Sequence, residues 1–305
     1  MKKIEPKDFE IYIKKKPTYL IKKQLKKLKY VELNKEDEKK YILQIIKSIF
    51  EKKIQKSGKN YKKNWNRGWK ENYENYKKSK NIKDLIPKYF FKSKIARIGN
   101  RLILTKSINF DLKILKLITD YVYEKYLLKE KNIIEFGCGT GHNLISLTKL
   151  NKKANLFGLD WSKSSQKIFK LLKKKYPKLN GYSFDYFNPK FNKKIKLQKN
   201  NWSALTVASL EQVGNNFKKF IKFLKQNNPR VIINIEPINE LMSKEKILDY
   251  LSIKYSKNRN YLDNYYNYLK ILEKKKVIKI IEVKKSYFGS LFINGYSIIV
   301  WKFLR

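Results

Sequence analysis

The 305-residue chain has one cysteine, one histidine and six arginines, and each scarcity excludes a class of chemistry. With Cys138 as the only thiol, a disulfide within the chain is excluded, and a free thiol fits a reducing compartment. With only Cys138 and His142, neither an ordinary zinc cluster nor a Cys–His nucleophile is expected. The sequence therefore predicts no metal site.

Long apolar runs are also missing. No window approaches the roughly twenty unbroken apolar residues of a membrane span, and the start, MKKIEPKDFEIYIKKK, lacks the apolar stretch of a signal peptide. The content of 42% hydrophobic and 14% aromatic residues suffices for one large core and a smaller appended unit. We expect a cytoplasmic protein without a membrane span, and no pattern predicts its oligomeric state.

Acidic residues are few, and the chain is lysine-rich. The 26 acidic and 72 basic residues give a formal net charge of +46, which ordinarily indicates a polyanionic partner. Six of the basic residues are arginine and 66 are lysine, scattered through every segment, whereas proteins that read bases use the bidentate fork of arginine. Abundant Asn, Ile and Tyr suggest the coding bias of an AT-rich genome. Nucleic acid is a disfavoured partner, although this surface would hold RNA nonspecifically at low salt.

The segment Asn132 to Asn143, NIIEFGCGTGHN, is the most informative part of the chain. An apolar run predicts a buried strand, and apolar residues at helical spacing follow from Leu144 to Leu150, so the glycines lie at a strand-to-helix turn. Gly137 and Gly139 would let the backbone approach a ligand closely, and Gly141 would let the helix pack tightly on the strand. An ordinary glycine turn is the alternative.

The acid before the glycines separates this turn from a dinucleotide site. The dinucleotide fingerprint Gly-x-Gly-x-x-Gly binds a pyrophosphate, which a carboxylate at Glu135 would repel. A ligand with an ammonium and a sulfonium suits that carboxylate, which indicates S-adenosylmethionine. The residues Glu135, Gly137, Gly139 and Gly141 resemble the first motif of the class I (Rossmann-like) S-adenosylmethionine-dependent methyltransferases, and the resemblance extends from about Phe110 to the C-terminus.

The resemblance implies an α/β fold with a seven-stranded, mostly parallel sheet that ends in an antiparallel hairpin. Apolar, β-branched runs at residues 155–161, 181–187, 203–209 and 230–235 supply candidate strands, and Val277 to Val283 with Tyr296 to Phe303 supply the hairpin. We place the catalytic domain at residues 101–305 and an N-terminal helical region at residues 1–100.

The cofactor site is expected along the carboxyl ends of the predicted strands. Asp160 ends the second run about twenty residues after the glycine turn, where an acid accepts hydrogen bonds from ribose hydroxyls; helix capping is its alternative role. Asp185 stands where the family usually has an acid or amide for the adenine amine, or else is a solvated loop acid. Cys138 within the turn, Trp161 and Ser209 complete the predicted cofactor-binding residues.

Methyl transfer needs an acceptor held in line with the methyl carbon and, for a hydroxyl, a base. Glu211 and Glu236 follow the fourth and fifth predicted strands, on loops that would be neighbours over the cofactor. We predict Glu211 as the general base, Glu236 with Glu240 as acceptor ligands, and His142 as a contact to the cofactor carboxylate or a proton acceptor. Solvated loop acids and a helix-capping histidine are the alternatives.

The first hundred residues contain an aromatic stripe. In YKKNWNRGWKENYENY, four aromatic residues fall on one helical face: Trp65, Trp69, Tyr73 and Tyr76. This pattern favours packing against the core. The alternative is a lid over the acceptor, and Pro87 to Phe91 would add to the same wall. The sequence Ser209-Leu210-Glu211-Gln212 lacks the Asn/Asp-Pro-Pro-aromatic loop of adenine-amine methyltransferases. We predict a small-molecule or cell-surface sugar acceptor; an RNA or protein methyltransferase and a non-catalytic protein with a relic pocket are the alternatives.

Overall fold

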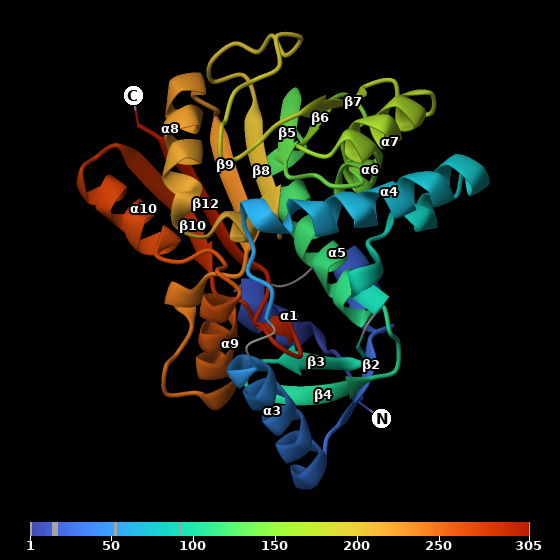
Figure 1. Ribbon diagram of the computed structural model, residues 1–305, viewed down its shortest axis with the longest axis vertical. Coiled ribbons are helices and arrows are strands. Elements are labelled where there is room, and N and C mark those ends of the chain that lie inside the picture. The colour runs from blue at the N-terminus through green and yellow to red at the C-terminus, as the bar shows by residue number, and fades with distance from the viewer. Residues whose placement is uncertain (1, 14–17, 52–53, 92, 305) are drawn as a thin grey trace.

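The computed structural model describes residues 2–13, 18–51, 54–91 and 93–304, and its centre is a seven-stranded sheet (Figure 1). The strands lie in the order β10-β12-β9-β8-β5-β6-β7. In chain order, they are β5 (Asn132–Phe136), β6 (Asn155–Asp160), β7 (Leu179–Ser183), β8 (Ser203–Val207), β9 (Val231–Glu236), β10 (Ile278–Lys284) and β12 (Ser297–Phe303).

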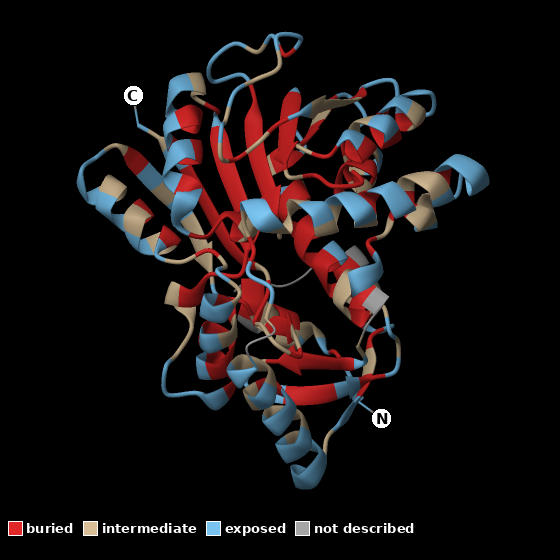
Figure 2. Ribbon diagram, in the orientation of Figure 1, coloured by how far each residue is buried: buried red, intermediate tan, exposed pale blue. Residues whose placement is uncertain are grey.

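Alternation along the central strands assigns each face of this sheet to its own helices. Ile133 of β5 packs in one apolar cluster with the helices α5–α7, whereas Ile134 packs in a second cluster with α8 and α10. Figure 2 shows the central strands buried along their length. The helices are α5 (Phe110–Val122), extended by the π-helical turn Tyr123–Leu127, α6 (His142–Leu150), α7 (Lys163–Lys173), α8 (Phe217–Asn227) and α10 (Tyr265–Lys274).

The strand directions confirm the predicted fold class. β7, β6, β5, β8 and β9 run parallel, and β12 pairs antiparallel with both β9 and β10. The register sets Glu135 beside Gly158 of β6 and Leu205 of β8. The carboxyl ends of these strands therefore share one edge, which is where open α/β sheets bind ligands.

The N-terminal region is not wholly helical, so that part of the sequence prediction is wrong. Five strands form a second, antiparallel sheet in the order β1-β2-β4-β3-β11. They are β1 (Lys2–Lys3), β2 (Lys29–Glu32), β3 (Ile95–Ile98), β4 (Arg101–Thr105) and β11 (Phe288–Ser290). The predicted boundary between residues 100 and 101 falls in the turn Gly99-Asn100 that joins β3 to β4, and β11 enters this sheet from the connection between β10 and β12.

Helices accompany the second sheet: α1 (Pro6–Ile13), α2 (Tyr19–Leu25), α3 (Lys35–Phe50) and α9 (Ile247–Asn258). The fully buried Arg97 of β3 connects this sheet to α9 and to the segment that follows β11. Its guanidinium donates to the backbone carbonyls of Leu291 (2.7 Å from Nη2) and Leu248 (2.6 Å from Nη1). These two carbonyls provide hydrogen-bond acceptors for the buried guanidinium.

Helix α4 (Lys62–Ser79) lies against α7 at the level of the glycine turn (Figure 1). The 3₁₀ turns η1 (Lys59–Tyr61), η2 (Ile82–Leu85) and η3 (Lys88–Phe91) flank it. Asn72 in α4 donates to the carbonyls of Asp84 and Ile86, and before α4 Ser57 donates from its backbone to Arg259 O (2.7 Å). The helix is thus held at its middle, and the segment before it is held at Ser57. No helix in the described residues is long and apolar enough to cross a membrane.

Candidate cofactor and active site

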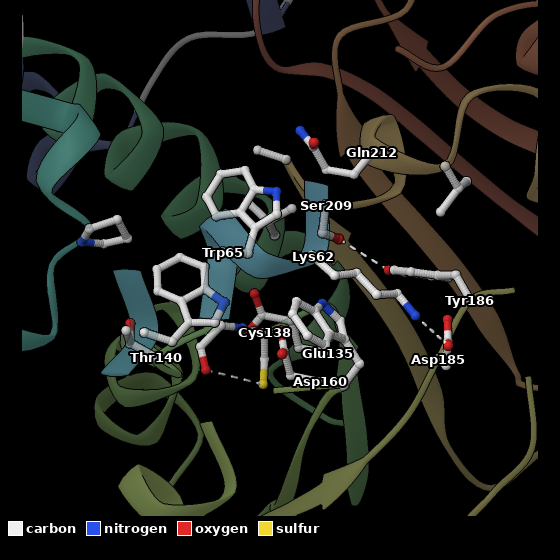
Figure 3. Close-up of a pocket in the computed structure, with 18 of the residues that line it drawn as sticks. Lys62, Trp65, Glu135, Cys138, Thr140, Asp160, Asp185, Tyr186, Ser209 and Gln212 are labelled. Carbon is white, nitrogen blue, oxygen red and sulfur yellow. Dashed lines mark hydrogen bonds and ion pairs between the residues drawn. The ribbon is translucent and has the colours of Figure 1, made fainter. Parts of the chain in front are cut away.

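A cavity that opens to solvent lies at the carboxyl ends of β5, β6 and β8 beneath α4 (Figure 3), and it encloses about 790 Å³ of atom-free space when the solvent in its mouth is included. It is lined by the glycine turn, by the loops after β6, β7 and β8, and by aromatic residues from the N-terminal region. These lining residues are Gly58, Lys62, Trp65, Trp69, Pro87, Tyr89, Glu135, Gly137, Cys138, Gly139, Thr140, His142, Asn143, Asp160, Trp161, Asp185, Tyr186, Phe187, Val207, Ala208, Ser209, Gln212 and Val213.

The glycine turn makes close contacts within the protein itself. Gly137 and Gly139 both have positive φ, at 68° and 53°. A Cβ on Gly137 would lie 2.5 Å from the Ser209 Cβ, and one on Gly139 would lie 2.8 Å from the Trp69 ring. Gly141, the N-cap of α6, likewise faces the Phe169 ring. Part of the space that these glycines leave is therefore filled by the protein's own side chains.

Glu135 is the next-to-last residue of β5, and it is almost fully buried. Its Oε1 accepts a hydrogen bond from Asn143 Nδ2 (2.8 Å), whereas Oε2 has no partner among the described residues. Burial raises the pKa of Glu135 to about 8, and the Asn143 bond partly offsets this shift. An unpartnered buried carboxyl oxygen beside a cavity is suited to a ligand cation.

Asp160 ends β6, and both of its oxygens hold backbone amides. Oδ2 accepts from Gly139 N (3.0 Å) and Oδ1 from Ser162 N (2.8 Å), so Asp160 fastens the glycine turn to its own loop. Burial raises the pKa of Asp160 to about 6, opposed by these two bonds. The N-cap of α7 is Ser162, so the helix-capping alternative for Asp160 is wrong. Each of its oxygens keeps a lone pair that can accept a further hydrogen bond.

Asp185 lies at the cavity edge after β7 and is not simply solvated. Its Oδ2 lies 2.5 Å from Lys62 Nζ, and its Oδ1 accepts from Phe187 N (3.0 Å). The same ammonium lies 5.5 Å from the centroid of the Trp161 ring and 5.4 Å from that of Phe187. Lys62 thus connects α4 to the loops after β6 and β7.

The aromatic stripe of α4 has two parts with different surroundings, and the predicted packing against the core holds for one of them. Trp65 stacks on Trp69 at 5.4 Å between ring centroids and meets Tyr89 edge-on at 5.9 Å, and these three rings line the cavity. Tyr73 and Tyr76, later in the helix, belong to the main apolar cluster. The first half of the stripe covers the cavity, and the second half packs against the core.

His142 begins α6 and lines the cavity beside Thr140. Its Nδ1 lies 3.3 Å from Thr140 Oγ1, and burial lowers its pKa to about 4, so the imidazole is neutral near pH 7. Gly141 is the N-cap of this helix, so the capping alternative for His142 is wrong. His142 and three other lining residues each carry a buried polar atom that has no hydrogen-bond partner in the described chain. The four atoms are Trp65 Nε1, Glu135 Oε2, His142 Nε2 and Gln212 Oε1.

Glu236 has a different position from the one that the sequence suggested. It does not line the cavity, and its carboxyl accepts hydrogen bonds from the backbone amides of Ser209, Leu210 and Glu211 at 3.0–3.3 Å. Burial raises its pKa, opposed by these amides. This geometry corresponds to a structural role, in which Glu236 shapes the loop after β8 and leaves Ser209 against the cavity, with Ser209 Oγ 3.1 Å from Tyr186 OH.

Glu211 and Glu240 also lie outside the cavity lining. Glu211 is buried beside it, its Oε1 accepts from Gln212 Nε2 (2.8 Å), and burial together with repulsion from Glu236 raises its pKa. Glu240 accepts from Tyr266 N (3.0 Å) and borders a separate polar pocket near Lys218. The three predicted loop carboxylates are therefore not brought together over the cofactor, and Gln212 is the residue of this loop whose side chain reaches the cavity.

Cys138, the only cysteine of the chain, lies in the glycine turn. The Cys138 thiol is buried against Ser165 Oγ (3.8 Å), and burial raises its pKa well above the ordinary value, so it is an inert thiol. Among the described residues, no cluster of three His, Cys, Asp or Glu side chains has the arrangement of a metal site.

Several lining residues were not predicted from the sequence. Asn143, eight residues after Glu135, orients the Glu135 carboxyl, and Tyr186 bonds to Ser209. Lys62 could not be singled out, because a chain with 66 lysines gives no local signal for one of them. Gln212 directly follows the predicted Glu211, so its position in the same loop was the signal that could have identified it.

The charge of the cavity is opposite to that of the chain. Basic residues outnumber acidic ones by 72 to 26 in the whole sequence. The described cavity lining has three acids, Glu135, Asp160 and Asp185, and one basic residue, Lys62. Burial raises the pKa values of two of these acids, Glu135 and Asp160. A local reversal of charge with aromatic walls favours a ligand that carries positive charge.

No family model matches the chain, and no curated protein matches it. The structure is similar to solved methyltransferases. The O-methyltransferase NcsB1, in complex with S-adenosylmethionine and 2-hydroxy-5-methyl naphthoic acid, has 11% identity over 64% of this chain and 58% of its own, with a TM-score of 0.43. A SAM dependent methyltransferase from Aquifex aeolicus has 16% identity over 61% of this chain and 89% of its own, with a TM-score of 0.42.

The small RNA methyltransferase HEN1 is similar at the same level, with 14% identity over 67% of this chain and 28% of its own and a TM-score of 0.49. This chain spans less than two thirds of the length of NcsB1. Similarity at this level does not establish a shared activity, and the residues of the cavity carry the functional argument.

Proposed function

We propose that the protein is an S-adenosylmethionine-dependent methyltransferase that acts on a small-molecule acceptor. The observation that carries the proposal is the cavity at the carboxyl edge of the sheet, where a glycine turn, three acids and stacked indoles meet in a chain of net charge +46. A sulfonium cofactor supplies the activated methyl group. The acids and aromatic faces suit its two cationic groups, whereas they would oppose a pyrophosphate.

Six of the predicted cofactor residues have positions that support a cofactor role. Glu135 would hold the ammonium through its unpartnered Oε2, Asp160 would accept the ribose hydroxyls, and Asp185 would accept the adenine amine. Gly137 and Gly139 keep the turn close to the ligand. Ser209, placed by Glu236, would border the reacting centre. These assignments need no metal.

His142 is the best-placed proton acceptor. It lines the cavity, its imidazole is neutral because its pKa lies near 4, and its Nε2 is unpartnered in the described chain. Glu211 lies one residue outside the lining and bonds to Gln212, so it would act on the acceptor through Gln212 or after a local rearrangement. For an acceptor hydroxyl, a positioned base contributes about 10²- to 10⁴-fold to the rate.

The roof of the cavity favours a small acceptor such as a polyol or amine. Trp65, Trp69 and Tyr89 cover the space above the glycine turn, and hydrogen bonds hold α4 at Asn72 and the segment before it at Ser57. A polynucleotide or a folded protein could not pass beneath α4 without moving it. The high net charge keeps an RNA acceptor as the alternative, and its signature would be binding that persists at physiological salt.

Methyl transfer itself is the test. The purified protein is incubated with methyl-labelled S-adenosylmethionine and a protein-free, RNA-free metabolite extract, and products are detected by mass spectrometry. We expect one labelled product of low molecular mass, its loss in Glu135→Gln, and its retention in Glu245→Gln, whose side chain is exposed. Label that appears only when RNA or protein is supplied would refute the small acceptor, and binding of the cofactor without transfer to any of them would support a non-catalytic protein.

A further inference from the structure

The side chain of Lys62 lies in the part of the cavity formed by the loops after β6 and β7. Lys62 is the first residue of α4, yet its side chain ends 123 residues away along the chain, at Asp185 (Figure 3). Its ammonium lies 2.5 Å from Asp185 Oδ2 and within 5.5 Å of the ring centroids of Trp161 and Phe187. Among the described lining residues it is the only lysine or arginine.

These three partners mark the position of the cofactor's base. In open α/β sheets the acid at the end of the second parallel strand binds the ribose, here Asp160, so the base extends beyond it toward the next strand. Trp161 follows β6, and Asp185 and Phe187 follow β7, which places two aromatic faces and one carboxylate there. An adenine would bring a flat ring to the aromatic faces and an amino donor to the carboxylate.

Resting on the function proposed above, we propose that Lys62 is an internal occupant of the adenine subsite and competes with the cofactor for Asp185, Trp161 and Phe187. The Lys62 ammonium supplies the same two interactions as the base would: a donor to the carboxylate and a positive group over the rings. A ligand that has to displace such an occupant binds with an apparent affinity that is its intrinsic affinity multiplied by the fraction of molecules in which the subsite is free.

The surroundings of Lys62 allow its side chain to leave without moving the helix. The side chains of Lys62 and Asp185 are 27% and 36% exposed, so water can take over the ammonium, and an ion pair at this exposure is weak. The backbone of α4 is fixed independently, because Ser162 donates to Asn66 (3.0 Å) and Trp69 packs on Gly139. A rotation of the lysine side chain is therefore sufficient to open the subsite.

The test is a titration of the full-length protein with S-adenosylhomocysteine, which has no net charge near pH 7 and so responds little to the overall charge of the protein. Wild type, Lys62→Met and the control Lys63→Met, whose lysine is exposed, are compared by calorimetry. We expect Lys62→Met to bind roughly three- to tenfold more tightly than wild type, because one exposed ion pair and two cation–π contacts no longer compete. Lys63→Met should bind as wild type does, and the melting temperatures should agree.

A second pair of variants locates the effect. In an Asp185→Asn background, Lys62 has lost its charged partner, so the gain from Lys62→Met should shrink to less than about half. Weaker binding in Lys62→Met, or an equal gain in Lys63→Met, would overturn the inference while leaving the proposed function intact. Absence of binding in every variant including wild type would overturn both.

Discussion

Glu135 and Glu236 lie at the carboxyl ends of two strands of the same sheet, Glu135 next to last in β5 and Glu236 last in β9, and both are almost fully buried, but their surroundings differ. The loop after β8 passes over Glu236 and directs three backbone amides at its carboxyl. The glycine turn after β5 directs its first amide, Gly137 N, to the Leu159 carbonyl instead and leaves one oxygen of Glu135 without a partner in the described chain. A satisfied carboxylate holds a loop, whereas an unsatisfied one is available to a ligand.

Removal of Glu236 should give the largest effect, and the effect should be on stability. Glu236→Ala leaves three buried amides without their acceptor, so we expect the free energy of unfolding to fall by about 3 to 5 kcal/mol, and the melting temperature by on the order of 10 °C. Thermal unfolding followed by circular dichroism measures this. The exposed Glu245→Ala is the control, and an unchanged melting temperature in Glu236→Ala would remove the structural role.

Glu135 should behave in the opposite way. Glu135→Gln keeps an acceptor for Asn143 but removes the carboxyl that ionises when the ligand binds, so the melting temperature should change little, while affinity for S-adenosylhomocysteine falls about ten- to hundredfold. Calorimetric titration beside thermal unfolding separates the two quantities. If Glu135→Gln loses stability and keeps its affinity, the contrast between the two glutamates is reversed.

The parts of this site that the sequence could predict are those that local pattern encodes. The strand, the glycine turn and Asp160 follow one another within about thirty residues, and their periodicity and spacing determine where they meet. The antiparallel sheet of the N-terminal region was missed, although Gly99-Asn100 between the apolar runs of β3 and β4 is a hairpin signal. The helical stripes on either side of these short strands dominated the pattern of that region.

The roles of Lys62, Trp69 and Glu236 could not be read in the same way. Lys62 meets Asp185, and Trp69 meets Gly139, only because α4 lies across the glycine turn, a contact between distant segments that no local period encodes. Glu236 was predicted as an acceptor ligand, and only the path of the loop after β8 shows that its partners are backbone amides. Whether a carboxylate is satisfied by its own chain is a tertiary property.

The pH dependence of cofactor binding sharpens the contrast further. The pKa of Glu135 is about 8 in the ligand-free protein, so its carboxyl is protonated at pH 6 and cannot pair with an ammonium. Affinity for S-adenosylhomocysteine should therefore rise as the pH increases from 6 through 8, by less than about tenfold per unit. In Glu135→Gln only the smaller rise near the Asp160 pKa of about 6 should remain. A fall in affinity over this range would contradict the assigned ligand of Glu135.

The smallest effect is expected from the basic surface. If its 66 lysines act as scattered phosphate contacts, RNA binding should be independent of sequence and lost on raising the salt from 50 to 200 mM, and it should be the same in wild type and Glu135→Gln. Filter binding over a salt series measures this. If a defined RNA remains bound at physiological salt and competes with S-adenosylhomocysteine, the acceptor is RNA and not a small molecule.

The central claim is that the acidic cavity under α4 binds the sulfonium cofactor, and titration of the full-length protein with S-adenosylhomocysteine at physiological salt tests it most directly. Run at pH 7 in two buffers of different ionisation enthalpy, the titration should give one site per chain with release of a proton, because Glu135 must ionise on binding. The absence of binding heat, or saturable binding that neither Glu135→Gln nor Asp160→Ala weakens, would contradict the claim.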